Sequence, residues 1–197
     1  MPDREKFKEY MQVFLEENQK LNLISKNDEK YLWEKHICDS LSMELFFEKY
    51  GMPSTILDFG TGGGFPSVPL ALNYPDIEIT ALDSIAKKIR AVEHFKNKLN
   101  INNLEVICTR VEKFEGKFDV VTSRAVSSLK NIIEYAIPKL KMQGYFVAYK
   151  SRKSQEEILQ TLPALRKYNA KIIDVIDYKL PIEEEHERNL IVIKFEK

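Results

Sequence analysis

The sequence predicts an α/β protein: a seven-stranded, mainly parallel sheet with helices on both faces and an N-terminal helical extension. From residue 54 onward, short apolar strands alternate with amphipathic helices, and this alternation requires crossover connections between parallel strands. The last two β segments are joined by only a short connection, which favours an antiparallel hairpin at one edge of the sheet. We expect residues 1–50 to form the extension and residues 51–197 to form one compact unit.

The elements follow in order. Apolar residues keep helical spacing in two stretches of the extension, 7–15 and 32–41; Asn27–Asp28 can cap the second helix, and Gly51 with Pro53 would end it. Strands are expected at 55–59, 77–82, 104–107, 118–122, 144–149, 171–178 and 189–195. Helices are expected at 66–73, 85–99, 129–139 and 155–162. A parallel set that closes with a reversed strand is typical of the Rossmann-like fold of S-adenosylmethionine-dependent methyltransferases.

Composition and charge narrow the class of protein. Lys and Arg number 30, as do Asp and Glu. The chain therefore lacks the net positive charge expected of a protein that binds free nucleic acid by itself. No apolar run reaches the roughly 18–20 residues that a membrane-spanning helix needs, and the charged N-terminus does not resemble a signal peptide. We therefore expect a cytoplasmic monomer without a membrane partner. The two cysteines and three histidines are scattered, so no metal site is expected.

The strongest local signal is the glycine-rich stretch Asp58–Pro66, which a strand enters and a helix leaves. Glycines such as Gly60 and Gly62 let the chain turn sharply and let a ligand approach the backbone. A dinucleotide site would need a third glycine where Phe65 stands, and no P-loop motif is present. The acidic Asp58 suits a cationic ligand such as S-adenosylmethionine better than an anionic one. A structural turn without a ligand is the alternative.

Asp83 is the second signal, because it ends the strand that follows the glycine-rich stretch. An acid in this position can accept hydrogen bonds from a ribose diol. The alternative is that Asp83 caps the next helix.

These stretches, together with others, resemble the RsmG family, also called GidB, which methylates N7 of one guanine in bacterial small-subunit (16S) ribosomal RNA. The matching stretches include His36–Leu41, Leu82–Ser84, Arg110–Glu112, Ser123–Ala125 and Ala148–Lys150. The resemblance implies S-adenosylmethionine as the cofactor and small-subunit ribosomal RNA, or the ribosomal particle, as the partner.

The resemblance also implies roles for single residues. Gly60 and Phe65 would line the cofactor site, and Val111 and Glu112 would border the adenine. Arg124 would lie at the methyl-transfer region and is expected to contact the cofactor there. Ser67 stands where the family usually has glycine, so the start of the following helix can pack differently.

The implied reaction needs no general base, because N7 of guanine carries no proton; the enzyme has to supply proximity and alignment. Arg124 is the candidate catalytic residue. We expect it to contact O6 or a phosphate, since a fork onto N7 would block the nucleophile. A surface salt bridge is the alternative for Arg124.

Two further residues are candidates for RNA contact. His36 is one, although a packed histidine with Asp39 and Ser40 as partners is the alternative. Lys150 is the other; it could meet a phosphate, with Arg152–Lys153 extending the patch, or belong to a solvated face.

Rival functions remain open at this stage. The same fold and cofactor could serve a methyltransferase for a small molecule or a protein, because a fold does not decide the substrate. A cofactor-binding protein that has lost catalysis is a second alternative. A nicotinamide dehydrogenase is disfavoured by Phe65 at the third-glycine position.

Overall fold

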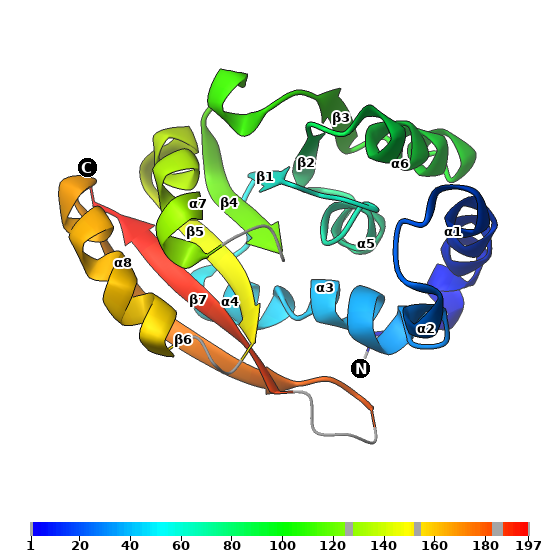
Figure 1. Ribbon diagram of the computed structural model, residues 1–197, viewed down its shortest axis with the longest axis horizontal. Coiled ribbons are helices and arrows are strands. Elements are labelled where there is room, and N and C mark those ends of the chain that lie inside the picture. Colours follow the sequence, from blue (N-terminus) through cyan, green and yellow to red (C-terminus); the bar gives the residue numbers. More distant parts are fainter. Residues whose placement is uncertain (1, 125–127, 152–154, 183–186, 197) are drawn as a thin grey trace.

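A seven-stranded sheet in the order β3-β2-β1-β4-β5-β7-β6 organises the molecule (Figure 1). The computed structural model describes residues 2–124, 128–151, 155–182 and 187–196. The strands are β1 (Thr55–Phe59), β2 (Glu78–Asp83), β3 (Leu104–Cys108), β4 (Phe118–Arg124), β5 (Leu140–Ser151), β6 (Ala170–Lys179) and β7 (Glu187–Phe195). The first five run parallel, and β7 is antiparallel to both of its neighbours. The expected seven-stranded sheet with an antiparallel hairpin at one edge is confirmed.

Helices cover both faces of this sheet. In the later part of the chain they are α5 (Ser67–Asn73), α6 (Ala86–Lys98), α7 (Leu129–Ala136) and α8 (Gln155–Lys167), with short 3-10 turns η3 (Val111–Lys113) and η4 (Ile137–Lys139). Figure 1 shows α7 and α8 on one side of the sheet and α5 and α6 on the other. Right-handed crossovers between parallel strands produce this two-sided cover.

Alternating strand residues divide the core between the two faces. In β1, Ile56 joins the cluster under α5 and α6, whereas its neighbour Leu57 joins the cluster under α7. Both side chains are fully buried. Strands buried on both faces read as continuous apolar runs, which is why the central strands could be located from the sequence.

The N-terminal helices pack on the α5–α6 face. They are η1 (Glu5–Phe7), α1 (Lys8–Leu21), α2 (Lys26–Glu29), η2 (Leu32–Cys38), α3 (Asp39–Leu41) and α4 (Glu44–Tyr50). Phe7, Tyr10 and Phe14 are buried in the same apolar cluster as Ile56. The N-terminal helices and the sheet thus share one apolar cluster. The division of the chain at residue 50 stays a prediction.

Two local expectations for the extension turn out differently. The expected second helix is interrupted: a single turn, α2, precedes a π-helical stretch, η2, that runs directly into α3. Its cap is not Asn27–Asp28 but Ser25, whose hydroxyl accepts from the Asp28 N–H at 3.2 Å. Gly51 does end the last of these helices, with a φ of 89°. Ser25 has the better cap geometry because its backbone is extended at that point.

Candidate functional site

The glycine-rich loop after β1 folds back onto the end of β2. The backbone N–H groups of Gly60 and Thr61 donate to the carbonyl oxygen of Leu82, at 2.7 and 3.0 Å. Gly64 has a φ of 93°, and a Cβ built there would lie 2.7 Å from Cγ2 of Val68. A side chain at this position is therefore excluded both by the left-handed backbone and by the start of α5.

Asp58 lies beneath this loop and is completely buried. Its Oδ2 accepts from the Ser67 N–H at 3.3 Å, while its Oδ1 has no hydrogen-bond partner among the described residues. Burial raises the pKa of this carboxyl to about 7, against the hydrogen bonds of Thr61 and Ser67, which lower it. The Ser67 and Thr61 hydroxyls are bonded to each other at 2.6 Å, so the serine at the family's usual glycine position ties the start of α5 to the loop.

A cavity of about 560 Å³ opens beside the loop, at the carboxyl ends of β1, β2 and β3. Gly60, Asp83, Val111 and Glu112, all predicted for the cofactor, line it together. Asp83 Oδ2 accepts from the Gly62 N–H at 3.0 Å and Oδ1 accepts from the Ile85 N–H at 2.9 Å. Asp83 therefore lines the cavity and orders the turn before α6, but it does not cap that helix, whose N-cap is Ile85 without a side-chain cap.

The residues of this cavity fit an adenosine-containing cofactor such as S-adenosylmethionine. Each oxygen of Asp83 uses one lone pair on the backbone, and the second lone pair of each can accept from a ribose hydroxyl. Leu82, Val111 and Ile132 supply apolar surface for a flat base. The volume also falls in the range of about 300–1,000 Å³ that small-molecule sites occupy.

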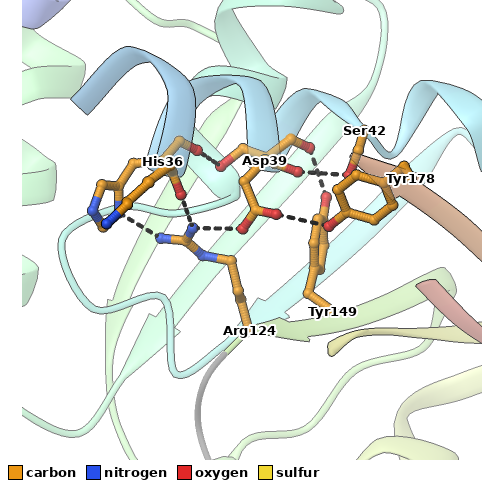
Figure 2. Close-up of polar contacts among 8 residues, drawn as sticks. His36, Asp39, Ser42, Arg124, Tyr149 and Tyr178 are labelled. Atoms are coloured by element: carbon orange, nitrogen blue, oxygen red, sulfur yellow. Dashed lines mark hydrogen bonds and ion pairs between the residues drawn. The ribbon is translucent and has the colours of Figure 1, made fainter. Parts of the chain in front are cut away.

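Arg124, at the end of β4, is held by residues of the N-terminal helices (Figure 2). Its Nη1 donates to the carbonyl oxygen of Lys35 at 3.1 Å and to Oδ2 of Asp39 at 2.9 Å. Its Nη2 lies 3.1 Å from Nδ1 of His36. The side chain is only 15% exposed. The salt bridge expected as the alternative is present, with Asp39, but it is largely buried and does not lie on the open surface.

Asp39 is fixed from its other side by the terminal hairpin. The hydroxyl of Tyr178, on β6, donates to Asp39 Oδ1 at 2.7 Å (Figure 2). Tyr149, on β5, donates to the carbonyl oxygen of Ser40 at 2.6 Å. The carboxylate of Asp39 thus connects Arg124 with Tyr178, and three distant parts of the chain meet in one network.

His36 is packed and hydrogen-bonded, as the packed alternative expected, but its ring is bonded to Arg124 and not to Asp39 or Ser40. Its Nδ1 meets Arg124, and the Ser40 hydroxyl donates instead to the backbone carbonyl of His36 at 2.6 Å. Burial, and next the charge of Arg124, lower the pKa of His36 to about 4, so the ring is neutral at physiological pH. Its Nε2 is buried and has no hydrogen-bond partner in the part of the chain that the structure describes.

A second cavity, of about 440 Å³, lies beside this network. It is lined by His36, Arg124 and Lys150, the three residues predicted for catalysis or RNA contact, and also by Tyr178 and Arg188. Lys150 forms an ion pair with Glu157 at 2.9 Å. Arg152–Lys153, predicted to extend the patch, lie outside the described residues. The sequence pattern missed Tyr178, whose contact with Asp39 spans 139 positions and leaves no local signal.

Phe65 connects the glycine-rich loop with Arg124 and His36. It is 3% exposed and belongs to the glycine-rich loop, next to a cis peptide bond with Pro66. The Arg124 guanidinium carbon lies 5.1 Å from the centre of the Phe65 ring, and the His36 ring lies 5.0 Å from it. Of the predicted residues, four line the first cavity (Gly60, Asp83, Val111 and Glu112) and three line the second (His36, Arg124 and Lys150); Asp58, Gly62 and Phe65 line neither.

Two negative findings hold for the described residues. None of the described helices combines the length and the apolar character that crossing a membrane would require. In the same part of the chain, no group of three or more His, Cys, Asp or Glu side chains is placed to hold a metal ion.

Comparison with known proteins places the chain in a family. Two solved structures share the fold at 17% identity: a methyltransferase of Pyrococcus furiosus (TM-score 0.59, 80% of this chain and 83% of that one) and a SAM-dependent O-methyltransferase of Thermotoga maritima (TM-score 0.57, 81% and 65%). Curated relatives named ribosomal RNA small subunit methyltransferase G are more similar. The protein of Thermoanaerobacter sp. (strain X514) is 38% identical over 96% of this chain and 81% of its own length, and that of Lysinibacillus sphaericus (strain C3-41) is 34% identical over 90% and 77%. The family model described as GidB, rRNA small subunit methyltransferase G, matches residues 3–190, and the chain belongs to this family.

Proposed function

We propose that this protein transfers the methyl group of S-adenosylmethionine to N7 of a guanine in bacterial small-subunit (16S) ribosomal RNA. Family membership and the names of the curated relatives support the RNA substrate and the cofactor. The observation that carries the proposal is that the glycine-rich loop borders a cavity suited to the cofactor and, through Phe65, packs against Arg124 and His36, which line a second, polar cavity. A methyl donor in the first cavity and a base in the second would then lie at two sides of the same loop.

The cofactor is assigned to the first cavity. Asp83 would accept from the ribose hydroxyls, and Val111 with Glu112 would border the adenine. Gly60 and Gly62 would let the loop backbone approach the ligand, and both have positive φ values. Asp58, whose Oδ1 has no partner among the described residues, would face the positive charge of the cofactor.

S-adenosylmethionine supplies a methyl group on a positively charged sulfur. Transfer of this methyl group would form the N7–carbon bond as the sulfur–carbon bond breaks, and would leave the electron pair on sulfur and the positive charge on the base. No proton moves, so the residues around the base need only orient it and exclude water. The neutral His36 and the paired charges of Arg124 and Asp39 suit this reaction, since they place no uncompensated positive charge beside N7.

RNA contact is assigned to the second cavity. His36 would meet the base, and Lys150 at the end of β5 would approach the phosphate backbone. Arg124 lines the same cavity and packs against Phe65 of the glycine-rich loop, so it stays the candidate catalytic residue. A neutral overall charge is consistent with a substrate already folded in a ribosomal particle, where shape adds to local charge. The monomeric state and the cytoplasmic location stay predictions.

Transfer of labelled methyl from S-adenosylmethionine tests this function. Unmodified small subunits, their deproteinised RNA and a panel of small molecules are compared, and the modified base is then mapped. We expect 7-methylguanine at one position of the RNA. Cofactor binding without label in either form of the RNA would refute the proposal, as would label in a small molecule alone.

A further inference from the structure

One face of α7 is turned to the first cavity. Four residues of this helix line the cavity: Asn131, Ile132, Glu134 and Tyr135. Their spacing places them on one side of the helix. The turn η3, which also lines the cavity, follows β3, whereas α7 follows β4. Because β2 and β1 lie between these two strands, the cavity is bounded by two segments that leave the sheet at separate places.

The apolar residues of the cavity differ in how much surface they expose. Phe59, Leu82 and Ile132 are each at most 2% exposed, so they belong to the core beneath the cavity. Val111, on η3, is half-buried. Tyr135, on α7, is 37% exposed. Val111 and Tyr135 are thus the apolar lining residues with the larger accessible surface, and they come from the two bounding segments.

The ring of Tyr135 also lacks a partner within the described part of the protein. The chain has nine tyrosines, and each of the other eight forms a side-chain hydrogen bond, an aromatic contact or a contact with a cation. Tyr135 forms none of these with any described residue. An aromatic ring gains most from contact with another flat ring, and a base has a π-face that such a ring can cover.

We propose that Tyr135 is a further cofactor-binding residue, whose ring stacks on the face of the adenine that Val111 leaves open. This inference rests on the proposed function for the place of the cofactor, but not for the RNA substrate. Val111 and Glu112, which were assigned to the adenine, both belong to η3 and border the base from that segment. Tyr135 would approach the same base from α7.

Other side chains of the cavity are less suited to this contact. Asn131 and Glu134, the polar neighbours of Tyr135 on α7, have no ring. Glu134 is also ion-paired with Lys167 of α8, at 3.6 Å. Arg110 can stack on a base as well, but it directly precedes η3 and belongs to the same bounding segment as that turn. The stacking contact from α7 is therefore left to Tyr135.

A stacking contact at the adenine would serve binding and not the chemistry of transfer. The ribose separates the base from the sulfur, so the surroundings of the base are the same before and after the methyl group leaves. Loss of the Tyr135 ring should therefore raise KM for S-adenosylmethionine and leave kcat at saturating cofactor unchanged.

The first test truncates the ring. In Tyr135→Ala the dissociation constant of S-adenosylhomocysteine should rise about 5- to 20-fold, as measured by calorimetric titration. Tyr135→Phe, which keeps the ring and loses only the hydroxyl, should stay within about twofold of wild type. Leu162→Ala is the matched control, because Leu162 is 40% exposed on α8 and does not line this cavity. Circular dichroism and urea unfolding check that each variant is folded.

The second test asks which part of the cofactor the ring contacts. 5′-Methylthioadenosine keeps the adenine and lacks the amino-acid group, so Tyr135→Ala should weaken its binding by the same factor as for S-adenosylhomocysteine. S-ribosylhomocysteine lacks the base, and its affinity, measured by competition, should not change. In Tyr135→Trp the new indole should be quenched when S-adenosylhomocysteine binds. Wild type is the reference for the signal of Trp33, the one native tryptophan.

The outcomes separate this inference from the proposed function. Equal affinities of wild type and Tyr135→Ala for S-adenosylhomocysteine overturn the role of Tyr135. An equal loss for S-ribosylhomocysteine does so too, since the residue would then support the cavity and not the base. A loss in Tyr135→Phe as large as in Tyr135→Ala would place the contact in the hydroxyl and overturn stacking. Wild-type protein that labels neither form of the RNA, but shows the expected loss in Tyr135→Ala, overturns the proposed function and leaves the role of Tyr135 standing.

Discussion

Asp39 Oδ2 lies 2.9 Å from Nη1 of Arg124, and this ion pair ties the N-terminal helices to the carboxyl end of β4. Asp39 is 3% exposed. A buried pair of this kind contributes little relative to an apolar pair of the same shape, but removal of one partner leaves the other charge buried and uncompensated. The largest effect on stability is therefore expected when one of the two charges is removed.

Asp39→Asn is therefore expected to be costly. The exchange keeps the shape of the side chain and removes its charge, so the free energy of unfolding should fall by about 3–5 kcal/mol. Urea unfolding measures this change. Asp177→Asn, on the exposed side of β6, is the control and should change the stability by less than about 0.5 kcal/mol. Equal stabilities of the two variants would contradict the assigned importance of the ion pair.

Asp83→Asn should weaken cofactor binding without unfolding the protein. One of the two carboxylate oxygens becomes an amide N–H₂ group, which opposes either the Gly62 N–H or a ribose hydroxyl. The dissociation constant for S-adenosylhomocysteine should rise about tenfold, as expected for one lost hydrogen bond to a charged group. Calorimetric titration provides the value, with Asp76→Asn, an exposed residue before β2, as the control. Unchanged affinity would remove Asp83 from the cofactor site.

Cofactor affinity should depend on pH through Asp58. Its pKa in the free protein is raised to about 7 by burial, so the carboxyl is protonated below that pH. A bound cation favours the ionised form and lowers the pKa, and binding below pH 7 therefore releases a proton. The affinity for S-adenosylmethionine should rise by up to about tenfold per pH unit from pH 5.5 to pH 7 and level off above it. In Asp58→Asn the affinity should be nearly flat over this range; a slope that persists in the variant would place its origin elsewhere.

The stability of the folded protein should depend on pH through His36. Its pKa is about 4 in the folded protein, against about 6.5 when unfolded. Between these values the unfolded chain binds the extra proton, so stability is retained above pH 6.5 and is lost as the pH falls towards 4, by up to about 3 kcal/mol. The difference in unfolding free energy between wild type and His36→Asn, measured by urea unfolding at pH 7.5 and pH 4.5, should shrink accordingly. A constant difference would mean that the ring is not buried in its neutral form.

Much of the fold was accessible from the sequence because its signals are local. The apolar runs of β1 and β2, the turn chemistry of Asp58–Pro66 and the period of α6 each depend on residues within a few positions of one another. The same holds for Asp83 and Glu112, since the carboxyl ends of parallel strands meet at one edge of a sheet. A parallel sheet with neighbouring strands therefore predicts that Asp83 and Glu112 line the same cavity.

The second half of the site could not be obtained in this way. Asp39, Arg124 and Tyr178 come from helix, strand and hairpin, and their contacts span 85 and 139 positions. Nothing in the composition near Arg124 indicates that its donors are occupied by the protein. The π-helical stretch that presents His36 also has no local signature, because its geometry is imposed by packing rather than by propensity.

The sequence by itself determined the sheet, the glycine-rich loop and the family, since each depends on the order and spacing of neighbouring residues. Only the tertiary structure decided which hydrogen-bonding groups remain available. That Nδ1 of His36 is already bonded follows from the position of a guanidinium 88 residues further along the chain. Hydrogen-bond capacity is divided among partners in space, and partners that are distant in the chain leave no pattern in its sequence.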